Sequence, residues 1–292
     1  MAAGSKSALK APIPEVSSIS PLCQDADVWL VDIWGVLHNG IRPFLSAGEA
    51  CRKFRNHGGR VILVSNSPRP AEGVARQLRD IGVDEQAYDA IITSGDVSRE
   101  LIAAYAGQGI FHLGPDRDLG VYDGTGVQRV APDEAAVVVC TGLFDDERES
   151  PQDYRTRLEE FAKRKLELIC VNPDVTAERG GRLIYCAGAL AELYGQLGGV
   201  VHYAGKPFAP IYDAAEAIAA TLMGAPVPRF RMLAIGDGAK TDILGAARAG
   251  IASVFVASGV SVNQGEALSD AAQRLFPDDL VRPVAVMKML SW

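Results

Sequence analysis

Four residues in this 292-residue sequence have the chemistry that phosphoryl transfer requires, namely Asp32, Ser65, Lys206 and Asp237. An aspartate carboxylate can attack phosphorus and form an acyl phosphate, which divides one difficult displacement into two easier ones. A serine hydroxyl can donate a hydrogen bond to a phosphoryl oxygen, and a lysine ammonium can stabilise the charge that develops there. Carboxylates also hold Mg²⁺ beside a substrate phosphate. The four residues therefore indicate metal-dependent phosphoryl chemistry with Asp32 as the nucleophile.

Neighbouring residues extend this candidate site. Asn66 and Ser67 follow Ser65, and their backbone N–H groups could bind a phosphoryl oxygen. Asp242 lies on the segment after Asp237 and fits either a residue that orients water beside a metal or an ordinary carboxylate in the first turn of a helix. Each residue alone is also compatible with common turn chemistry. The prediction therefore depends on the combination.

Short apolar runs place these residues at the ends of strands. The runs that we expect to form strands are Val28–Val31, Arg60–Val64, Ala90–Thr93, Arg231–Ile235 and Ser253–Val256. Segments with helical spacing at Ser46–His57 and Ala71–Ile81 separate the first three runs. This alternation predicts a doubly wound α/β fold, in which helices cover both faces of a mainly parallel sheet. Ligands of such sheets bind beyond the carboxyl ends of the strands, where Asp32, Ser65 and Asp237 stand.

Composition argues against several other classes of protein. The chain is 48% hydrophobic and 22% charged, which suits a folded protein with a sizeable core. Its formal charge is -7 without a block of Lys or Arg, which argues against nucleic-acid binding. No apolar run reaches the roughly 18 residues that a membrane helix needs. Five scattered cysteines are typical of reduced thiols, and residues 1–20 resemble a flexible tail rather than a secretory signal, so we expect a cytoplasmic protein.

The order of these motifs resembles that of the haloacid dehalogenase (HAD) superfamily. The matching segments are Asp32-x-x-Gly-x-Leu, Ser65-Asn66, Gly205-Lys206-Pro207, and Gly236-Asp237 with Asp242. The long insert between the second and third motifs resembles the capped, phosphatase-like hydrolases of class IIA. The resemblance implies a Rossmann-like core formed by residues 21–106 and 187–292, with a smaller α/β cap domain inserted at residues 107–186.

The resemblance also implies a role for each matching residue. Asp32 would be the nucleophile and a ligand of Mg²⁺, together with Asp237 and the backbone carbonyl of Trp34. Asp242 would support the metal without binding it directly. Lys206 would neutralise the charge of the nucleophile and of the phosphate. Contacts with the phosphorylated substrate would come from Ser65, Asn66, Ser67, Asn172, Asp174 and Lys206.

Trp34 departs from the pattern of the family. Its phosphatases usually have a second aspartate at this position, which protonates the leaving group and then activates water. An indole is only a weak N–H donor, and general acid–base assistance is typically worth about 10²–10⁴ in rate. The departure predicts weakened hydrolysis with a bias toward acidic leaving groups, unless His38 in the same loop supplies the proton.

Three functions remain open at this level. The first is a Mg²⁺-dependent hydrolase of a small sugar, nucleotide, pyridoxal or aryl phosphate, with an aspartyl-phosphate intermediate at Asp32. The second is a catalytically attenuated protein that binds a phosphorylated metabolite and acts in regulation. The third is cleavage of a carbon–halogen or carbon–phosphorus bond, but the metal-binding character of Asp237 and the class IIA position of the cap argue against it.

Class IIA members often pair through their caps, so we expect a homodimer by analogy.

Overall fold

Two parallel sheets and one hairpin organise the computed structural model, which describes residues 12–179, 182–257, 261–263, 265–277 and 279–292. The larger sheet has six parallel strands in the order β13-β12-β11-β1-β2-β3. These strands are β1 (Val28–Val31), β2 (Arg60–Ser65), β3 (Ala90–Thr93), β11 (Met232–Gly236), β12 (Ala252–Val256) and β13 (Ala285–Met287). The helices around them are α1 (Leu45–Asn56), α2 (Ala71–Ile81), α3 (Ser94–Ala103), α6 (Ala209–Met223), α7 (Leu244–Ala249) and α8 (Leu268–Leu275).

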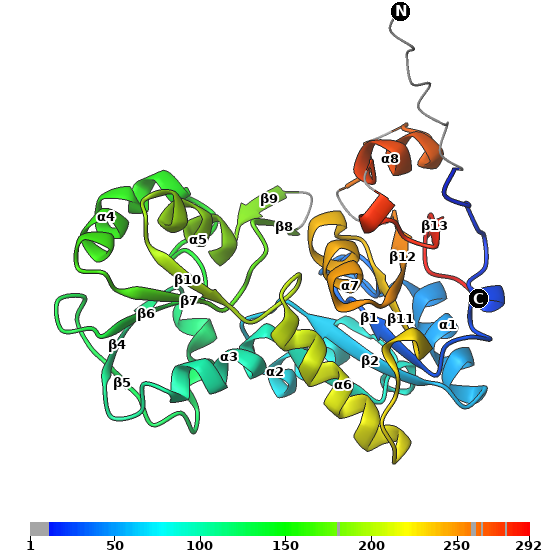
Figure 1. Ribbon diagram of the computed structural model, residues 1–292, viewed down its shortest axis with the longest axis horizontal. Helices are drawn as coiled ribbons and strands as arrows, with labels where there is room; N and C mark the ends of the chain where they lie inside the picture. The colour runs from blue at the N-terminus through cyan, green and yellow to red at the C-terminus, as the bar shows by residue number, and fades with distance from the viewer. Residues whose placement is uncertain (1–11, 180–181, 258–260, 264, 278) are drawn as a thin grey trace, which may run out of the picture.

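Alternate residues of the central strands face opposite layers of helices. Trp29 and Val31 of β1 pack with residues of α1 and α2, whereas Val28 and Leu30 pack with residues of α6 and α7. Every residue of β1 is therefore buried, which explains why the strand reads as a continuous apolar run. This arrangement confirms the predicted doubly wound α/β fold (Figure 1). Among the described helices, none is long and apolar enough to cross a membrane.

A smaller parallel sheet lies beside the larger one (Figure 1) and forms a unit that we call the cap. Its strand order is β10-β7-β6-β4-β5. The strands are β4 (Gly109–Leu113), β5 (Gln128–Arg129), β6 (Val137–Cys140), β7 (Glu167–Cys170) and β10 (Val200–Tyr203), with helices α4 (Arg155–Lys163) and α5 (Ala187–Gln196). An antiparallel hairpin of β8 (Thr176–Arg179) and β9 (Arg182–Tyr185) extends from the cap toward α7 (Figure 1).

The cap continues beyond the boundary predicted after residue 186. Leu190 and Tyr194 of α5 belong to the same apolar cluster as Val138 of β6. Strand β10 pairs with β7, so that Val200 lies opposite Glu167. A local sequence pattern cannot show this pairing, because β7 and β10 are distant in the sequence and lie side by side only in the folded protein. We propose that the cap runs from β4 to β10 and that the chain returns to the core after Tyr203.

Residues 12–20 do not form the predicted flexible tail. Ile19 is fully buried in the same cluster as Trp29, and the Val16 N–H donates to the carbonyl of Val286 at 2.9 Å. Val286 belongs to β13, the last strand at one edge of the larger sheet, whose backbone groups need hydrogen-bond partners. The segment therefore covers a sheet edge. Residues 1–11 of the predicted tail lie outside the described residues.

Candidate active site

Three neighbouring strands of the larger sheet bring the predicted residues together. Asp32 follows β1, Ser65 ends β2 and Asp237 follows β11, and β1 lies between the other two strands. The register aligns Val31 with Ile235, and the Asp32 N–H donates to the Ile235 carbonyl at 2.8 Å. Because the strands are parallel, their carboxyl ends meet at one edge, as the sequence pattern predicts.

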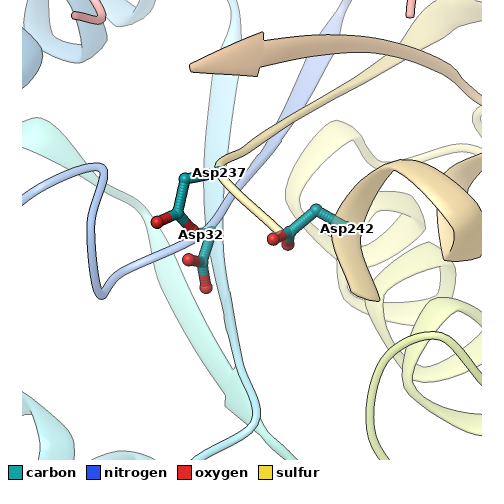
Figure 2. A group of neighbouring side chains, drawn as sticks. All are labelled: Asp32, Asp237 and Asp242. Carbon is teal, nitrogen blue, oxygen red and sulfur yellow. The ribbon is translucent and has the colours of Figure 1, made fainter. Parts of the chain in front are cut away.

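The carboxylates of Asp32, Asp237 and Asp242 form an acidic cluster at this edge, and Figure 2 shows the three side chains converging. One oxygen from each carboxylate lies within 4.8 Å of the others. Two glycines permit this approach. A Cβ on Gly35 would lie 2.1 Å from Asp237 Oδ2, and a Cβ on Gly236 would lie 2.2 Å from Asp242 Cγ. Any side chain at either position would displace a carboxylate of the cluster.

Lys206 lies between two of these carboxylates and is 4% exposed. Its Nζ donates to Asp32 Oδ1 at 2.5 Å, to Asp242 Oδ1 at 2.7 Å and to the Val64 carbonyl at 2.9 Å. These three bonds satisfy all the donors of an ammonium group. Burial tends to lower the pKa of Lys206, but the carboxylates of Asp242 and Asp32 outweigh it and raise the pKa above its ordinary value. The ammonium is therefore a fixed positive charge beside the proposed nucleophile.

The acidic cluster fits a divalent cation. Burial raises the pKa of Asp237 well above its ordinary value, and the neighbouring carboxylate of Asp32 raises it further. If all three carboxylates ionise, the single ammonium leaves two negative charges uncompensated, which a divalent ion would neutralise. Asp242 accepts from Lys206 through Oδ1 and from the Gly238 N–H through Oδ2, at 3.0 Å. Its oxygens are thus engaged, so Asp32 and Asp237 fit direct ligands better than Asp242 does.

Asn66 joins the end of β2 to both Lys206 and the cap. Its Oδ1 accepts from the Lys206 N–H at 2.7 Å, and its Nδ2 donates to the Lys206 carbonyl at 3.0 Å and to Asp174 Oδ1 at 2.8 Å. A Cβ on Gly205 would lie 2.4 Å from Asn66 Oδ1, so the glycine before Lys206 makes room for this contact. The Asn66 amide therefore binds the backbone on both sides of the Lys206 Cα and so positions Lys206.

Replacing Asn66 with alanine should lower the free energy of unfolding by about 1–3 kcal/mol, because the buried N–H and carbonyl of Lys206 lose their partner. Urea denaturation followed by circular dichroism measures the change. Asn39→Ala is a matched control, since the side chain of Asn39 accepts from exposed backbone N–H groups of Ile41 and Arg42 in its own turn. Equal losses for the two variants would contradict the assigned role of Asn66.

Ser65 and Ser67 form a turn after β2. The Ser67 N–H donates to Ser65 Oγ at 3.1 Å, and the Arg69 N–H donates to Ser67 Oγ at 3.1 Å. The Ser67 N–H is therefore directed at Ser65, which does not favour its predicted contact with a phosphoryl oxygen. The hydroxyl hydrogen of Ser65 can still donate to a phosphoryl group, because Ser65 Oγ acts as an acceptor in this turn.

Trp34 packs within its own loop. A Cβ on Gly40 would lie 2.6 Å from the Trp34 ring, and the His38 ring meets the indole edge-on with centroids 5.0 Å apart. His38 Nδ1 accepts from the Gly40 N–H at 2.8 Å, and burial lowers the pKa of His38 to about 4. A neutral imidazole with an occupied Nδ1 is a poor acid at neutral pH. The structure therefore does not support the alternative in which His38 supplies the proton.

His38 should remain neutral in the folded protein until the pH approaches about 4. An unfolded histidine takes up a proton near pH 6.5, so between these values the unfolded state binds more protons. Folding stability should consequently fall as the pH drops from about 6.5 toward 4, by up to about 1.4 kcal/mol per pH unit. Urea denaturation of wild type and His38→Gln over this range measures the difference. An NMR titration of the His38 ring with a midpoint near 6.5 would rule out this account.

Two cavities meet at the site. The larger, about 680 Å³, lies over Asp32, Lys206 and the acidic cluster. The smaller, about 370 Å³, extends from Trp34 and Ser65 into the cap. Trp34, Ser65 and Asp174 line both cavities, and Asn172 lines the smaller one. A phosphoryl group beside Asp32 could therefore carry a substituent that reaches into the cap.

The smaller cavity also contains charged residues that the sequence interpretation did not assign to the site. Arg117 and Arg179 both donate to Asp146 Oδ2, at 2.5 and 3.1 Å. Arg69 Nε lies 3.8 Å from Asp118 Oδ1. Arg69 could have been predicted as a site residue from the sequence, because it lies four residues after Ser65. No local pattern joins Arg117 to Asp146, because these residues are 29 positions apart.

Comparisons with known proteins match most of the chain. A family model described as haloacid dehalogenase-like hydrolase matches residues 29–128, and a model described as HAD-hydrolase-like matches residues 203–282. A solved structure of a hydrolase of the haloacid dehalogenase-like family from Brucella suis has 45% sequence identity and a TM-score of 0.84. The match covers 95% of this chain and 99% of that chain.

Two more distant relatives are named for phosphatase activities. A 4-nitrophenylphosphatase from Schizosaccharomyces pombe is 24% identical over 287 residues, which cover 89% of this chain and 92% of that protein. A glycerol phosphate phosphatase from Mycobacterium tuberculosis, solved with magnesium, is 22% identical with a TM-score of 0.68 and covers 91% of this chain and 75% of that chain. That phosphatase was also solved with calcium.

Proposed function

Because the chain is a phosphatase-type enzyme of the haloacid dehalogenase-like hydrolase family, we propose that it hydrolyses a small phosphorylated metabolite through an aspartyl phosphate at Asp32. The main support for the proposal is that the Lys206 ammonium donates hydrogen bonds to Asp32 and Asp242, beside Asp237. This arrangement combines a nucleophile, a fixed positive charge and a cation site at the ends of three adjacent strands.

Asp32 would attack phosphorus with Oδ2, since its Oδ1 accepts from Lys206. The attack forms an acyl phosphate and breaks the bond between phosphorus and the leaving oxygen. Water then attacks the acyl phosphate, which releases inorganic phosphate and restores the carboxylate. Lys206 and the Ser65 hydroxyl would stabilise the negative charge on the phosphoryl oxygens during both displacements.

Mg²⁺ is the proposed metal, and the residues that would hold it are Asp32, Asp237 and the carbonyl of Trp34, with Asp242 in support. When bound, it would neutralise charge on the transferring phosphoryl group. The relative solved with magnesium supports this choice, as does the charge of the acidic cluster.

Adding Mg²⁺ should raise the midpoint of thermal unfolding in the wild type and much less in Asp237→Asn. A ligand at about 100 times its dissociation constant adds about 2.7 kcal/mol of stability, because it binds the folded state alone. Differential scanning calorimetry with Mg²⁺ or EDTA measures both shifts. The matched control is Asp80→Asn on the exposed face of α2, which should respond like the wild type. An equal Mg²⁺ shift in Asp237→Asn would place the ion elsewhere.

The substrate is proposed to be a sugar, nucleotide, pyridoxal or aryl phosphate, because the combined cavities suit a small organic phosphate. The test is release of inorganic phosphate from a panel of such esters by purified protein with Mg²⁺. We expect measurable turnover of at least one ester. A complete lack of phosphate release across the panel would contradict the proposal.

Trp34 favours a second candidate, a regulatory protein that binds a phosphorylated metabolite with little turnover. If the protein is such a regulator, the wild type should bind phosphate esters without releasing phosphate. The Trp34→Asp variant should then gain hydrolysis. Phosphate release by the wild type would contradict this second candidate.

The predicted homodimer through the cap stays a prediction, as does the cytoplasmic location. Sedimentation velocity of the full chain tests whether it forms a dimer. Substitution of exposed apolar side chains of the cap, followed by the same measurement, tests whether the dimer forms through the cap. Leu183 and Val200 are suitable positions, because they are 64% and 55% exposed.

A further inference from the structure

Asp174 lies at the junction of the two cavities. In the described part of the chain, the carboxylates that line both cavities are those of Asp174 and Glu178. Asp32 borders the larger cavity, and the smaller one leads away into the cap. If the substituent of the substrate enters the smaller cavity, the oxygen that links it to phosphorus lies close to the junction. A carboxyl group there has the position that a general acid needs.

The loop that carries Asp174 is held on both sides. Asp174 Oδ1 accepts from Asn66 Nδ2 at 2.8 Å, its N–H donates to Asn172 Oδ1 at 3.1 Å, and its carbonyl accepts from the Gly188 N–H at 3.0 Å. A Cβ on Gly188 would lie 2.2 Å from the Pro173 carbonyl, so the start of α5 packs closely on this loop. Among the described residues, Asp174 Oδ2 has no hydrogen-bond partner, which leaves that oxygen available to a proton or a substrate.

The surroundings of Asp174 favour its protonated form more than water does. Burial raises the pKa of Asp174, while the Lys206 ammonium opposes this effect. The other titratable groups that interact electrostatically with it are the carboxylates of Asp32, Asp237 and Asp242, and the thiols of Cys170 and Cys186. The Asp242 carboxylate adds to the effect of burial on the pKa of Asp174, because a second negative charge nearby disfavours ionisation, whereas the hydrogen bond from Asn66 opposes it.

We propose that Asp174 supplies the acid–base chemistry that Trp34 cannot, an inference that rests on the proposed phosphatase function. In the first step, Asp32 attacks phosphorus, the bond to the leaving oxygen breaks, and the Asp174 carboxyl gives its proton to that oxygen. In the second step, the Asp174 carboxylate takes a proton from water while the water oxygen attacks phosphorus. The bond from phosphorus to Asp32 then breaks, and both carboxyl groups return to their starting states.

Trp34 alone predicts a bias toward acidic leaving groups, and Asp174 removes that bias. With the Asp174 carboxyl in place, the wild type should hydrolyse alkyl phosphates as well as esters with acidic leaving groups. A strong bias toward acidic leaving groups should appear only after the proton of Asp174 is removed. The competing interpretation is that Asp174 merely tethers Asn66, and so positions Lys206.

Asp174→Asn separates the two interpretations, because an asparagine oxygen can still accept from Asn66 but cannot exchange a proton at neutral pH. We expect this variant to lose about 10²–10⁴-fold in turnover of an alkyl phosphate and much less in the rate of the first-turnover burst of nitrophenolate from 4-nitrophenyl phosphate. Its rate should also lose the pH-dependent limb that the wild type shows. Acid quenching during turnover of the nitrophenyl ester should trap more phosphorylated protein than in the wild type, because water lacks its base.

Glu178→Gln, made in parallel, tests the other carboxylate that borders both cavities. The proposal is overturned if Glu178→Gln shows these changes and Asp174→Asn does not. It is also overturned if Asp174→Asn matches the wild type at every pH, or if it slows all esters equally without extra phosphorylated protein. A wild type that releases no phosphate overturns the proposed function together with this inference, whereas an active wild type with an unaltered Asp174→Asn variant overturns this inference alone.

Discussion

Replacing Asp32 with asparagine should lower phosphate release by at least about 10⁴-fold, since removal of a covalent nucleophile leaves only binding and charge stabilisation. Asparagine has the same shape as aspartate, and Lys206 keeps its bonds to Asp242 and Val64. The fold should therefore survive. Substitution also removes one negative charge from a cluster in which burial raises carboxyl pKa values, so stability without metal should not fall.

Steady-state phosphate release and thermal unfolding of Asp32→Asn together test this expectation. Asp80→Asn serves again as the control, because Asp80 is exposed on α2. An Asp32→Asn variant that folds and retains more than about one hundredth of wild-type turnover would exclude Asp32 as the nucleophile, given the size of the expected loss.

Replacing Lys206 with methionine should lower the free energy of unfolding by about 3–5 kcal/mol in the absence of metal, because removing one partner leaves buried carboxylates without a cation. Asp32 and Asp242 both lose their bond to the ammonium. The loss should be largest at neutral and higher pH. At lower pH the carboxylates can take up protons, since their folded pKa would then lie above the unfolded value of about 4, and the difference from the wild type should shrink.

Urea denaturation of Lys206→Met in EDTA, at pH 5 and pH 8, measures this effect. Mg²⁺ should recover part of the lost stability, because a divalent ion compensates the same carboxylates. Lys206→Arg provides a comparison that keeps the charge but places it on a planar group that cannot make the same three bonds. A loss below about 1 kcal/mol at pH 8 would show that the ammonium is not essential to the buried cluster.

Much of the core of the site can be predicted from the sequence because its residues end buried strands. The apolar run Val28–Val31 has the same bounds as β1, and the predicted strand Ala90–Thr93 coincides with β3. Once these strands are placed side by side in parallel, Asp32, Ser65 and Asp237 must share one edge. Local pattern and sheet geometry are sufficient for that inference.

Other features depend on contacts that no local pattern records. The place of β10 in the cap follows from its pairing with β7, and the buried position of Ile19 follows from its packing against Trp29. The neutral state of His38 is a consequence of burial, which the loop sequence does not reveal. Asp174 can be predicted as a residue of the substrate site, but its position between two cavities appears only in three dimensions.

In the proposed mechanism, phosphorus becomes covalently bound to Asp32. The most direct measurement is to quench the enzyme in acid during turnover with Mg²⁺ and a good ester, reduce the acyl phosphate with borohydride, and locate the modified residue by peptide mass spectrometry. Borohydride converts an aspartyl phosphate to homoserine, so we predict homoserine at position 32 in the wild type and unmodified aspartate in protein quenched without substrate. Active enzyme with an unmodified Asp32, or with the modification at another aspartate, would contradict the account.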